Sequence, residues 1–209
     1  MPNSPPILQA PSDLDPTADS APARTHSETE SGFLLYGLQS PINIGMILRV
    51  AETYRFRVSI YDHYGVLARP EALRTIEDFS CGALLRRGFG VLNDHAALDV
   101  FLEGKRLVST AIDPNACALP AYEFRPGDVF ALGNEYDGLP EPIVARADTV
   151  LNIPMPSGWT PKPVSLNPID PARKDPVARD GRPSLNVAMT AAILCYACFA
   201  SRRAGNEPL

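Results

Sequence analysis

The chain has 209 residues, of which 45% are hydrophobic, and a formal net charge of −5 at pH 7. This length and composition suit one ordinary domain with a sizeable core. The overall charge excludes a uniformly basic nucleic-acid-binding protein, but not a local basic patch, because the electrostatic field depends on how charges are distributed.

The first 30 residues differ from the rest in composition. They hold several of the 22 prolines, few large apolar side chains and no helical or strand period. Five acidic residues against Arg24 alone give this segment a net charge of −4, which leaves the remainder near −1. Such a composition predicts a disordered, Pro-rich acidic tail at 1–30.

The sequence disfavours secretion, a membrane span, disulfide bonds and a zinc site. The first 30 residues lack the apolar stretch of a secretory signal, and the apolar run at 187–200 is too short to span a bilayer. The four cysteines show neither a disulfide framework nor zinc-ligand spacing, and Cys195 and Cys198 are interpreted as buried core thiols. We therefore expect a cytoplasmic protein without a membrane segment or a metal site.

Short apolar runs alternate with helical periods from residue 33 onward. Strands are predicted at 33–38, 58–61, 88–92, 106–110, 128–132 and 149–153, and helices after Ser40-Pro41 and at 70–80, 95–102, 140–147 and about 184–203. Strands that alternate with helices predict an α/β fold with a largely parallel sheet.

The last predicted helix is the most unusual element. It begins with the polar cluster Ser184-Leu185-Asn186 and then runs apolar to Ala200, with only Thr190 interrupting. A surface helix carries a polar face, so we expect this one to be buried on nearly all sides, by its own domain and by a second subunit. Its polar start indicates a site.

A second segment of interest is Asn43-x-Gly45-x-x-x-Arg49. Asn43 can cap the helix, Gly45 allows a backbone to approach closely, and Arg49 can reach a phosphate or carboxylate with its planar fork. From this segment alone, the favoured interpretation is an exposed Arg49 paired with Glu52 in a weak surface contact.

Two further segments follow predicted strands. Leu132-Gly133-Asn134-Glu135 places polar groups at a strand end, where α/β proteins commonly bind ligands, although a plain Gly-rich turn would look the same. Ile153-Pro154-Met155 ends the last strand and precedes the Ser184 cluster after a long gap, and Ser184 alone would also serve as an ordinary N-cap.

Taken together and in this order, the three segments resemble the motifs of the SPOUT methyltransferases, specifically the SpoU/TrmH-like RNA ribose 2′-O-methyltransferases. The matching segments are 43–49, 132–135, and 153–155 with 184–188. The resemblance covers about 33–203.

The resemblance implies a SPOUT methyltransferase domain at 31–205, with a parallel sheet flanked by helices and a C-terminal trefoil knot. It also implies S-adenosyl-L-methionine as cofactor, a homodimer, and RNA as substrate, with tRNA favoured over rRNA. The implied cofactor-binding residues are Thr110, Gly133, Ile153, Met155 and Leu185.

The resemblance further implies a catalytic group made of Arg49, Asn43, Glu135, Ser184 and Asn186. In-line methyl transfer depends on positioning, and a ribose hydroxyl attacks better as it loses its proton. Because arginine stays protonated, a role of Arg49 as general base is less favoured than action through a neighbouring phosphate or by electrostatic stabilisation, and both alternatives stay open.

The chain departs from the family pattern in one place. An insertion at about 156–183 separates Ile153-Pro154-Met155 from Ser184 and holds Trp159 and several basic residues. It could hold RNA, through basic groups on phosphate and Trp159 stacked on a base, or it could be a surface decoration. A separate basic patch could be supplied by Arg55, Arg57, Arg86 and Arg87.

Two alternatives to a tRNA ribose methyltransferase stay open. One is a non-catalytic SPOUT-like RNA-binding protein, and the other is a SPOUT enzyme that acts on rRNA or on a base.

Overall fold

The computed structural model describes residues 30–111, 113, 115–156 and 185–204. The predicted tail, apart from Glu30, lies outside this range, as do the insertion beyond Pro156 and Ser184. Predictions about those segments stay predictions.

The described chain forms a seven-stranded sheet in which every strand pair is parallel. The spatial order is β3-β2-β1-β6-β4-β7-β5. The strands are β1 (Gly32–Tyr36), β2 (Arg57–Tyr61), β3 (Gly90–Leu92), β4 (Leu107–Thr110), β5 (Cys117–Ala118), β6 (Val129–Leu132) and β7 (Thr149–Asn152). The predicted α/β fold with a parallel sheet is confirmed.

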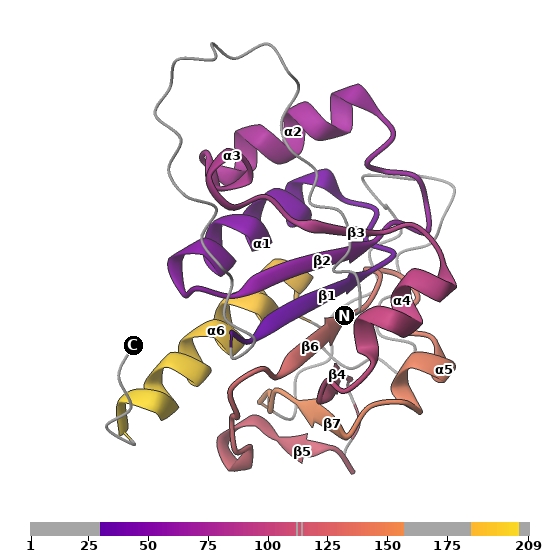
Figure 1. Ribbon diagram of the computed structural model, residues 1–209. Helices are drawn as coiled ribbons and strands as arrows, with labels where there is room; N and C mark the ends of the chain where they lie inside the picture. The colour runs from indigo at the N-terminus through magenta and orange to yellow at the C-terminus, as the bar shows by residue number, and fades with distance from the viewer. Residues whose placement is uncertain (1–29, 112, 114, 157–184, 205–209) are drawn as a thin grey trace.

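Helices cover both faces of the sheet (Figure 1). They are α1 (Pro41–Thr53), α2 (Pro70–Ser80), α3 (Ala83–Arg87), α4 (His95–Leu102), α5 (Glu141–Val144) and α6 (Val187–Ala204), with a 3-10 turn at Leu119–Ala121. Core residues of α1, α2, α3 and α6 share one apolar cluster, and those of α4 and α5 share the other. Within β1, Phe33 and Leu35 join the first cluster and Leu34 joins the second, so the strand is apolar throughout because both of its faces are covered.

The predicted elements are all present, with shifts of a few residues at their ends. The 70–80 and 95–102 helices are reproduced, whereas the helix predicted at 140–147 is the shorter α5. Two short elements, α3 with five residues and β5 with two, were not predicted. Segments this short carry too few side chains to show a period.

The close approach predicted at Gly45 is confirmed, and it is made by a neighbouring helix. A Cβ atom at Gly45 would lie 2.7 Å from the carbonyl oxygen of Ile76 and 2.7 Å from Cβ of Phe79. Both of these residues belong to α2, so a side chain at position 45 would push α2 away from α1.

Gly45→Ala is therefore expected to destabilise the fold by about 1–3 kcal/mol, the usual cost of overpacking, despite the better helix propensity of alanine. Urea denaturation followed by circular dichroism measures this, with Ser201→Ala at an exposed position of α6 as control. A free energy of unfolding equal to or above that of the wild type would show that α2 moves aside without destabilising the fold.

The predicted burial of the last helix is observed in part. The described residues bury one face of α6, formed by Ala188, Ala191, Leu194, Cys195 and Cys198. Met189 and Tyr196 are exposed, at 42% and 62%. Burial of this other apolar face by a second subunit stays a prediction.

The two thiols of α6 are core groups, as predicted. Burial raises the pKa of Cys195, and the neighbouring Cys198 adds to this effect. Across the described residues, α6 included, no helix meets the length and hydropathy that a membrane span requires.

Candidate active site

The first site segment is the turn between β1 and α1. Ser40 is the N-cap of α1, and its Oγ accepts a hydrogen bond from the backbone N–H of Asn43 at 3.3 Å. Pro41 occupies the first turn, where its missing N–H costs nothing. The prediction that Asn43 caps this helix is therefore wrong. Because Ser40 does so, the Asn43 side chain is available for other contacts.

Glu135, just beyond β6, accepts three hydrogen bonds from this turn. Its Oε1 accepts from Asn43 Nδ2 at 2.8 Å and from the backbone N–H of Ser40 at 3.3 Å. Its Oε2 accepts from the backbone N–H of Gln39 at 3.1 Å. Three hydrogen bonds fix the position of this carboxylate, so Glu135 is suited to holding the turn and Asn43 in place.

Asn186 connects the last motif to the same group. Its Nδ2 donates to Asn43 Oδ1 at 3.1 Å, while its Oδ1 accepts from the backbone N–H of Ala188 at 2.8 Å. Asn43 thus donates to Glu135 and accepts from Asn186. The chain of contacts Glu135–Asn43–Asn186, here called the polar network, joins three segments that are up to 143 positions apart.

The loop after β6 folds back tightly on itself. The carbonyl oxygen of Asn134 accepts from the N–H of Gly138 at 2.9 Å, and Gly138 has φ +71. A Cβ atom at Gly133 would lie 2.2 Å from the carbonyl carbon of Gly138. Position 133 therefore requires glycine for the loop itself.

The predicted cofactor residues lie at the ends of adjacent strands. Thr110 ends β4, Gly133 follows β6 and Ile153 follows β7, and β4 lies between β6 and β7 in the sheet. Since parallel strands share one carboxyl edge, these three residues occupy that edge. Thr110 Oγ1 also donates to the carbonyl oxygen of Ala131 at 3.0 Å, which ties β4 to β6.

Apolar side chains at this edge are left partly uncovered. Ile153 and Met155 are half-buried, and Leu185, just before α6, is 38% exposed. Partly exposed apolar groups near strand ends are the kind of lining that small-molecule sites use. Their chemistry is compatible with the adenine of S-adenosylmethionine.

Arg49 lies apart from the polar network. It is exposed on α1, six residues and about 9 Å of helix rise beyond Asn43. The predicted alternative, a pair with Glu52, is not formed, because Glu52 binds Arg86 with two contacts of 2.7 and 2.6 Å. Within the described chain, the Arg49 guanidinium makes no hydrogen bond or ion pair.

The suggested basic patch is neutralised only in part. Arg57 and Arg87 share the Glu30 carboxylate, at 3.3 and 3.2 Å, and Arg86 is held by Glu52. Four arginines against these two carboxylates leave a net positive charge, so a local cationic surface stays a prediction.

Gln39, Ser40 and Asn134 were not identified from the sequence. Gln39 acts through its backbone N–H group, which leaves no side-chain signature. Ser40 also caps α1 through its hydroxyl, and Ser40-Pro41 was the sequence signal that could have identified it. Asn134 donates from Nδ2 to the carbonyl oxygen of Gly37 at 2.6 Å and accepts two backbone N–H groups on Oδ1. Asn134 lies in the Leu132-Gly133-Asn134-Glu135 segment, and its place in this segment was the signal that could have identified it as a site residue.

A parallel α/β sheet with polar side chains joined at its carboxyl edge is a common architecture of ligand-binding domains. The model of the SpoU rRNA Methylase family matches residues 32–167, more than half of the chain, and the chain belongs to this family. The matched range ends before Ser184. A search of curated protein sequences gives no significant match.

Solved structures share this fold. The SpoU methyltransferase AviRb from Streptomyces viridochromogenes aligns with a TM-score of 0.65 and 22% identity, over 87% of this chain and 63% of AviRb. An AdoMet-bound rRNA methyltransferase from Sinorhizobium meliloti aligns with a TM-score of 0.61 and 20% identity, over 86% of this chain and 58% of its own.

A third structure comes from a study of the 2-OH methylation of C/U34 on tRNA. It aligns with a TM-score of 0.62 and 23% identity, over 85% of this chain and 99% of its own. The chain thus spans less than two thirds of AviRb and of the S. meliloti enzyme, but nearly all of the third. At these identities the likeness establishes the shared fold.

Proposed function

We propose that the protein transfers the methyl group of S-adenosylmethionine to a ribose 2′-hydroxyl in RNA. The observation that carries this proposal is the polar network, which joins residues of all three family motifs at the carboxyl edge of the sheet. Family membership supports the class of reaction.

The cofactor site is proposed at the ends of β4, β6 and β7. Ile153, Met155 and Leu185 would cover the adenine, while Gly133 and Thr110 keep the backbone of the two neighbouring strand ends in place. S-adenosylmethionine supplies an electrophilic methyl group on a sulfonium. The protein has to hold the 2′-oxygen in line with that group.

The polar network is proposed to orient the ribose. Glu135 fixes Asn43 and the 39–40 backbone, and Asn186 fixes the start of α6. Arg49, exposed and without an acidic partner in the described chain, is proposed to bind an RNA phosphate and to stabilise the charge that develops on the attacking oxygen. Ser184 stays a proposed member of this group.

Transfer RNA is the favoured substrate. This chain covers almost all of the neighbour from the tRNA C/U34 study. A structure of an A. aeolicus TrmH/SpoU tRNA modifying enzyme is also similar, with a TM-score of 0.62 and 17% identity. Ribosomal RNA is the second candidate substrate, because the similar S. meliloti protein is an rRNA methyltransferase.

The assembly is proposed to be a homodimer of knotted domains spanning 31–205. The open apolar face of α6, with Met189 and Tyr196 exposed, supports burial against a second copy, and Ile42 on α1 adds exposed apolar surface. Large exposed apolar side chains on a helix face are typical of interfaces. The trefoil knot is proposed from the family resemblance.

Methyl transfer to total tRNA and to total rRNA, followed by nucleoside mass spectrometry, tests the function. We expect a 2′-O-methylated nucleoside in the tRNA fraction. A methyl group on a base would favour the base-modifying alternative. Absence of transfer to every RNA, together with no heat of S-adenosylmethionine binding in calorimetry, would favour the non-catalytic alternative.

A further inference from the structure

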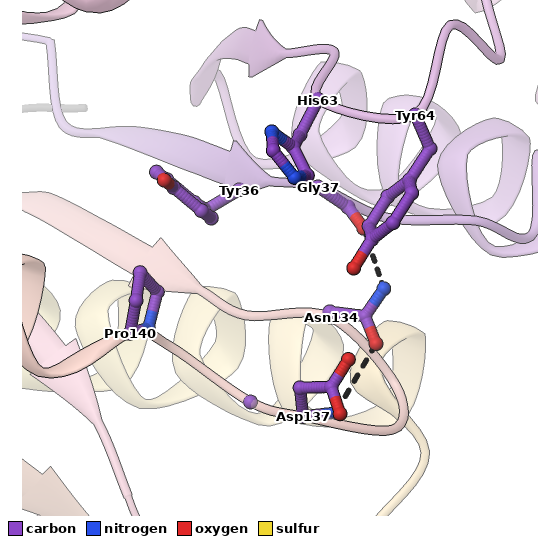
Figure 2. Close-up of a pocket in the computed structure, with 8 residues that line it drawn as sticks. Tyr36, Gly37, His63, Tyr64, Asn134, Asp137 and Pro140 are labelled. Atoms are coloured by element: carbon purple, nitrogen blue, oxygen red, sulfur yellow. Dashed lines mark hydrogen bonds between the residues drawn. The ribbon is translucent and has the colours of Figure 1, made fainter.

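A cavity opens beside the polar network, at the ends of β1, β2 and β6. Its volume is about 170 Å³, and it is lined by Tyr36, Gly37, His63, Tyr64, Asn134, Asp137, Gly138 and Pro140. Figure 2 shows Tyr36, His63 and Tyr64 on one side and Asp137 and Pro140 on the other. None of the predicted cofactor residues lines it, so we name it the aromatic pocket.

The rings of this pocket belong to a larger aromatic group. Tyr36 stacks on Tyr61 with centroids 4.8 Å apart, and His63 stacks on Tyr61 at 6.2 Å. The Tyr64 ring meets His63 edge to face at 4.8 Å. Burial, with Tyr61 and Tyr64 nearby, raises the pKa of Tyr36, so its phenol stays neutral at physiological pH.

The loop that presents His63 and Tyr64 is held by its own hydrogen bonds. The Asp62 carboxylate accepts from the backbone N–H groups of Val66 and Leu67 at 2.8 and 2.9 Å, and Arg69 donates to the Tyr64 carbonyl oxygen at 2.9 Å. The two rings are thus positioned before any ligand arrives, which lowers the entropic cost of binding.

Gly37 is required for the position of the Tyr64 ring. It has φ +62, and a Cβ atom there would lie 3.3 Å from Cε2 of Tyr64. The Gly37 carbonyl oxygen accepts from Asn134, which joins the loop after β1 to the loop after β6 across the floor of the pocket.

The size and chemistry of the pocket favour one flat ring system. Pockets for drug-sized ligands measure roughly 300–1,000 Å³, so this one is too small for a whole S-adenosylmethionine. Unstacked RNA bases bind proteins by stacking on Tyr and His side chains, and these are the side chains that line this pocket.

The pocket is also close enough to the polar network to serve the same substrate. Gly37 lines the pocket, and the backbone N–H of Gln39, two residues on, binds Glu135. Two residues span at most about 8 Å. Asn134, at the pocket floor, directly precedes Glu135.

We propose that the aromatic pocket binds an unstacked nucleobase of the RNA substrate, from the methylated nucleotide or from one next to it. This inference rests on the proposed function and adds a base-binding subsite to it. Tyr64 and His63 supply the stacking surface, and the bound base holds its ribose at the polar network.

Tyr64→Ala is expected to raise the Kd for the methylated RNA about 10-fold, since stacking accounts for a measurable share of binding to unstacked bases. Binding is measured by fluorescence anisotropy with the wild type, Tyr64→Ala and the ring-retaining Tyr64→Phe, which is expected to stay within about threefold. Leu85→Ala, a truncation of an exposed side chain on α3, is the control for surface changes.

Abasic RNA provides the decisive comparison. An abasic nucleotide at the target position or at one of its two neighbours is expected to weaken wild-type binding by a similar factor and to cause no further loss with Tyr64→Ala. Such non-additivity indicates a direct contact between the Tyr64 ring and the base that the abasic RNA lacks. If the losses add at all three positions, or if Tyr64→Ala leaves the Kd unchanged, the inference is overturned.

Two further outcomes distinguish a failure of the base-binding inference from a failure of the proposed function. A higher Kd for S-adenosylmethionine in Tyr64→Ala would assign the pocket to the cofactor and overturn the inference alone. Absence of RNA methylation by the wild type would overturn the proposed function, and the base-binding subsite with it.

Discussion

Replacing Arg49 by alanine is expected to lower kcat for RNA methylation about 100- to 1,000-fold, the usual cost of removing one charge-stabilising donor. The thermal stability should stay within 1–2 °C of the wild type, because surface substitutions away from packed or paired groups change stability little. Arg49 is exposed, and its guanidinium has no ion pair in the described chain.

Single-turnover methyl transfer and differential scanning calorimetry measure these two effects. Arg74→Ala is the matched control, because it removes the same charge from an exposed position of α2. Arg49→Lys separates charge from geometry: a lysine keeps the charge but loses the planar fork. Activity of Arg49→Ala equal to that of Arg74→Ala would exclude Arg49 from catalysis.

Glu135→Ala is expected to lower both activity and stability. It removes the acceptor of two backbone N–H groups and of the Asn43 amide. Loss of hydrogen bonds to a charged group costs about 1–3 kcal/mol of folding free energy. Because Asn43 also positions Asn186, we expect kcat to fall about 100-fold, a loss typical of misplaced catalytic groups.

Urea denaturation and the methylation assay test this prediction together. Glu141→Ala removes the same charge from an exposed position of α5 and serves as control. Glu135→Gln retains one accepting oxygen but places an amide N–H group against the donors of the turn, so we expect it to lie between the wild type and Glu135→Ala. Wild-type stability in Glu135→Ala would mean that water replaces the carboxylate.

The sequence alone predicted the elements that bury apolar side chains on a regular period. Both faces of the β1 strand are covered, so its apolar run is unbroken, and the 70–80 helix shows its period clearly. The strand ends that carry Thr110, Gly133 and Ile153 could be placed for the same reason. Short elements such as α3 left too little pattern to detect.

The contacts between the motifs required the tertiary structure. The family resemblance implied that Asn43, Glu135 and Asn186 belong to one site, and their hydrogen bonds show that the three side chains are in contact. The same structure shows Glu52 paired with Arg86, and one apolar face of α6 exposed among the described residues. Both depend on which partner lies nearest in space, which is not a property of local sequence. The Ser40 cap, in contrast, is a local contact that the Ser40-Pro41 pair could have predicted.

What the sequence by itself determined is the alternation of strands and helices, and the residue types available at each strand end. These follow from local periodicity and from polar groups that interrupt apolar runs. Only the tertiary structure decided that Arg49 lies apart from the polar network, and that Tyr36, His63 and Tyr64 enclose a pocket with Asp137 and Pro140. The reason is that parallel strands distant in the chain meet at one edge, and backbone donors such as Gln39 N–H act there without a side-chain signature.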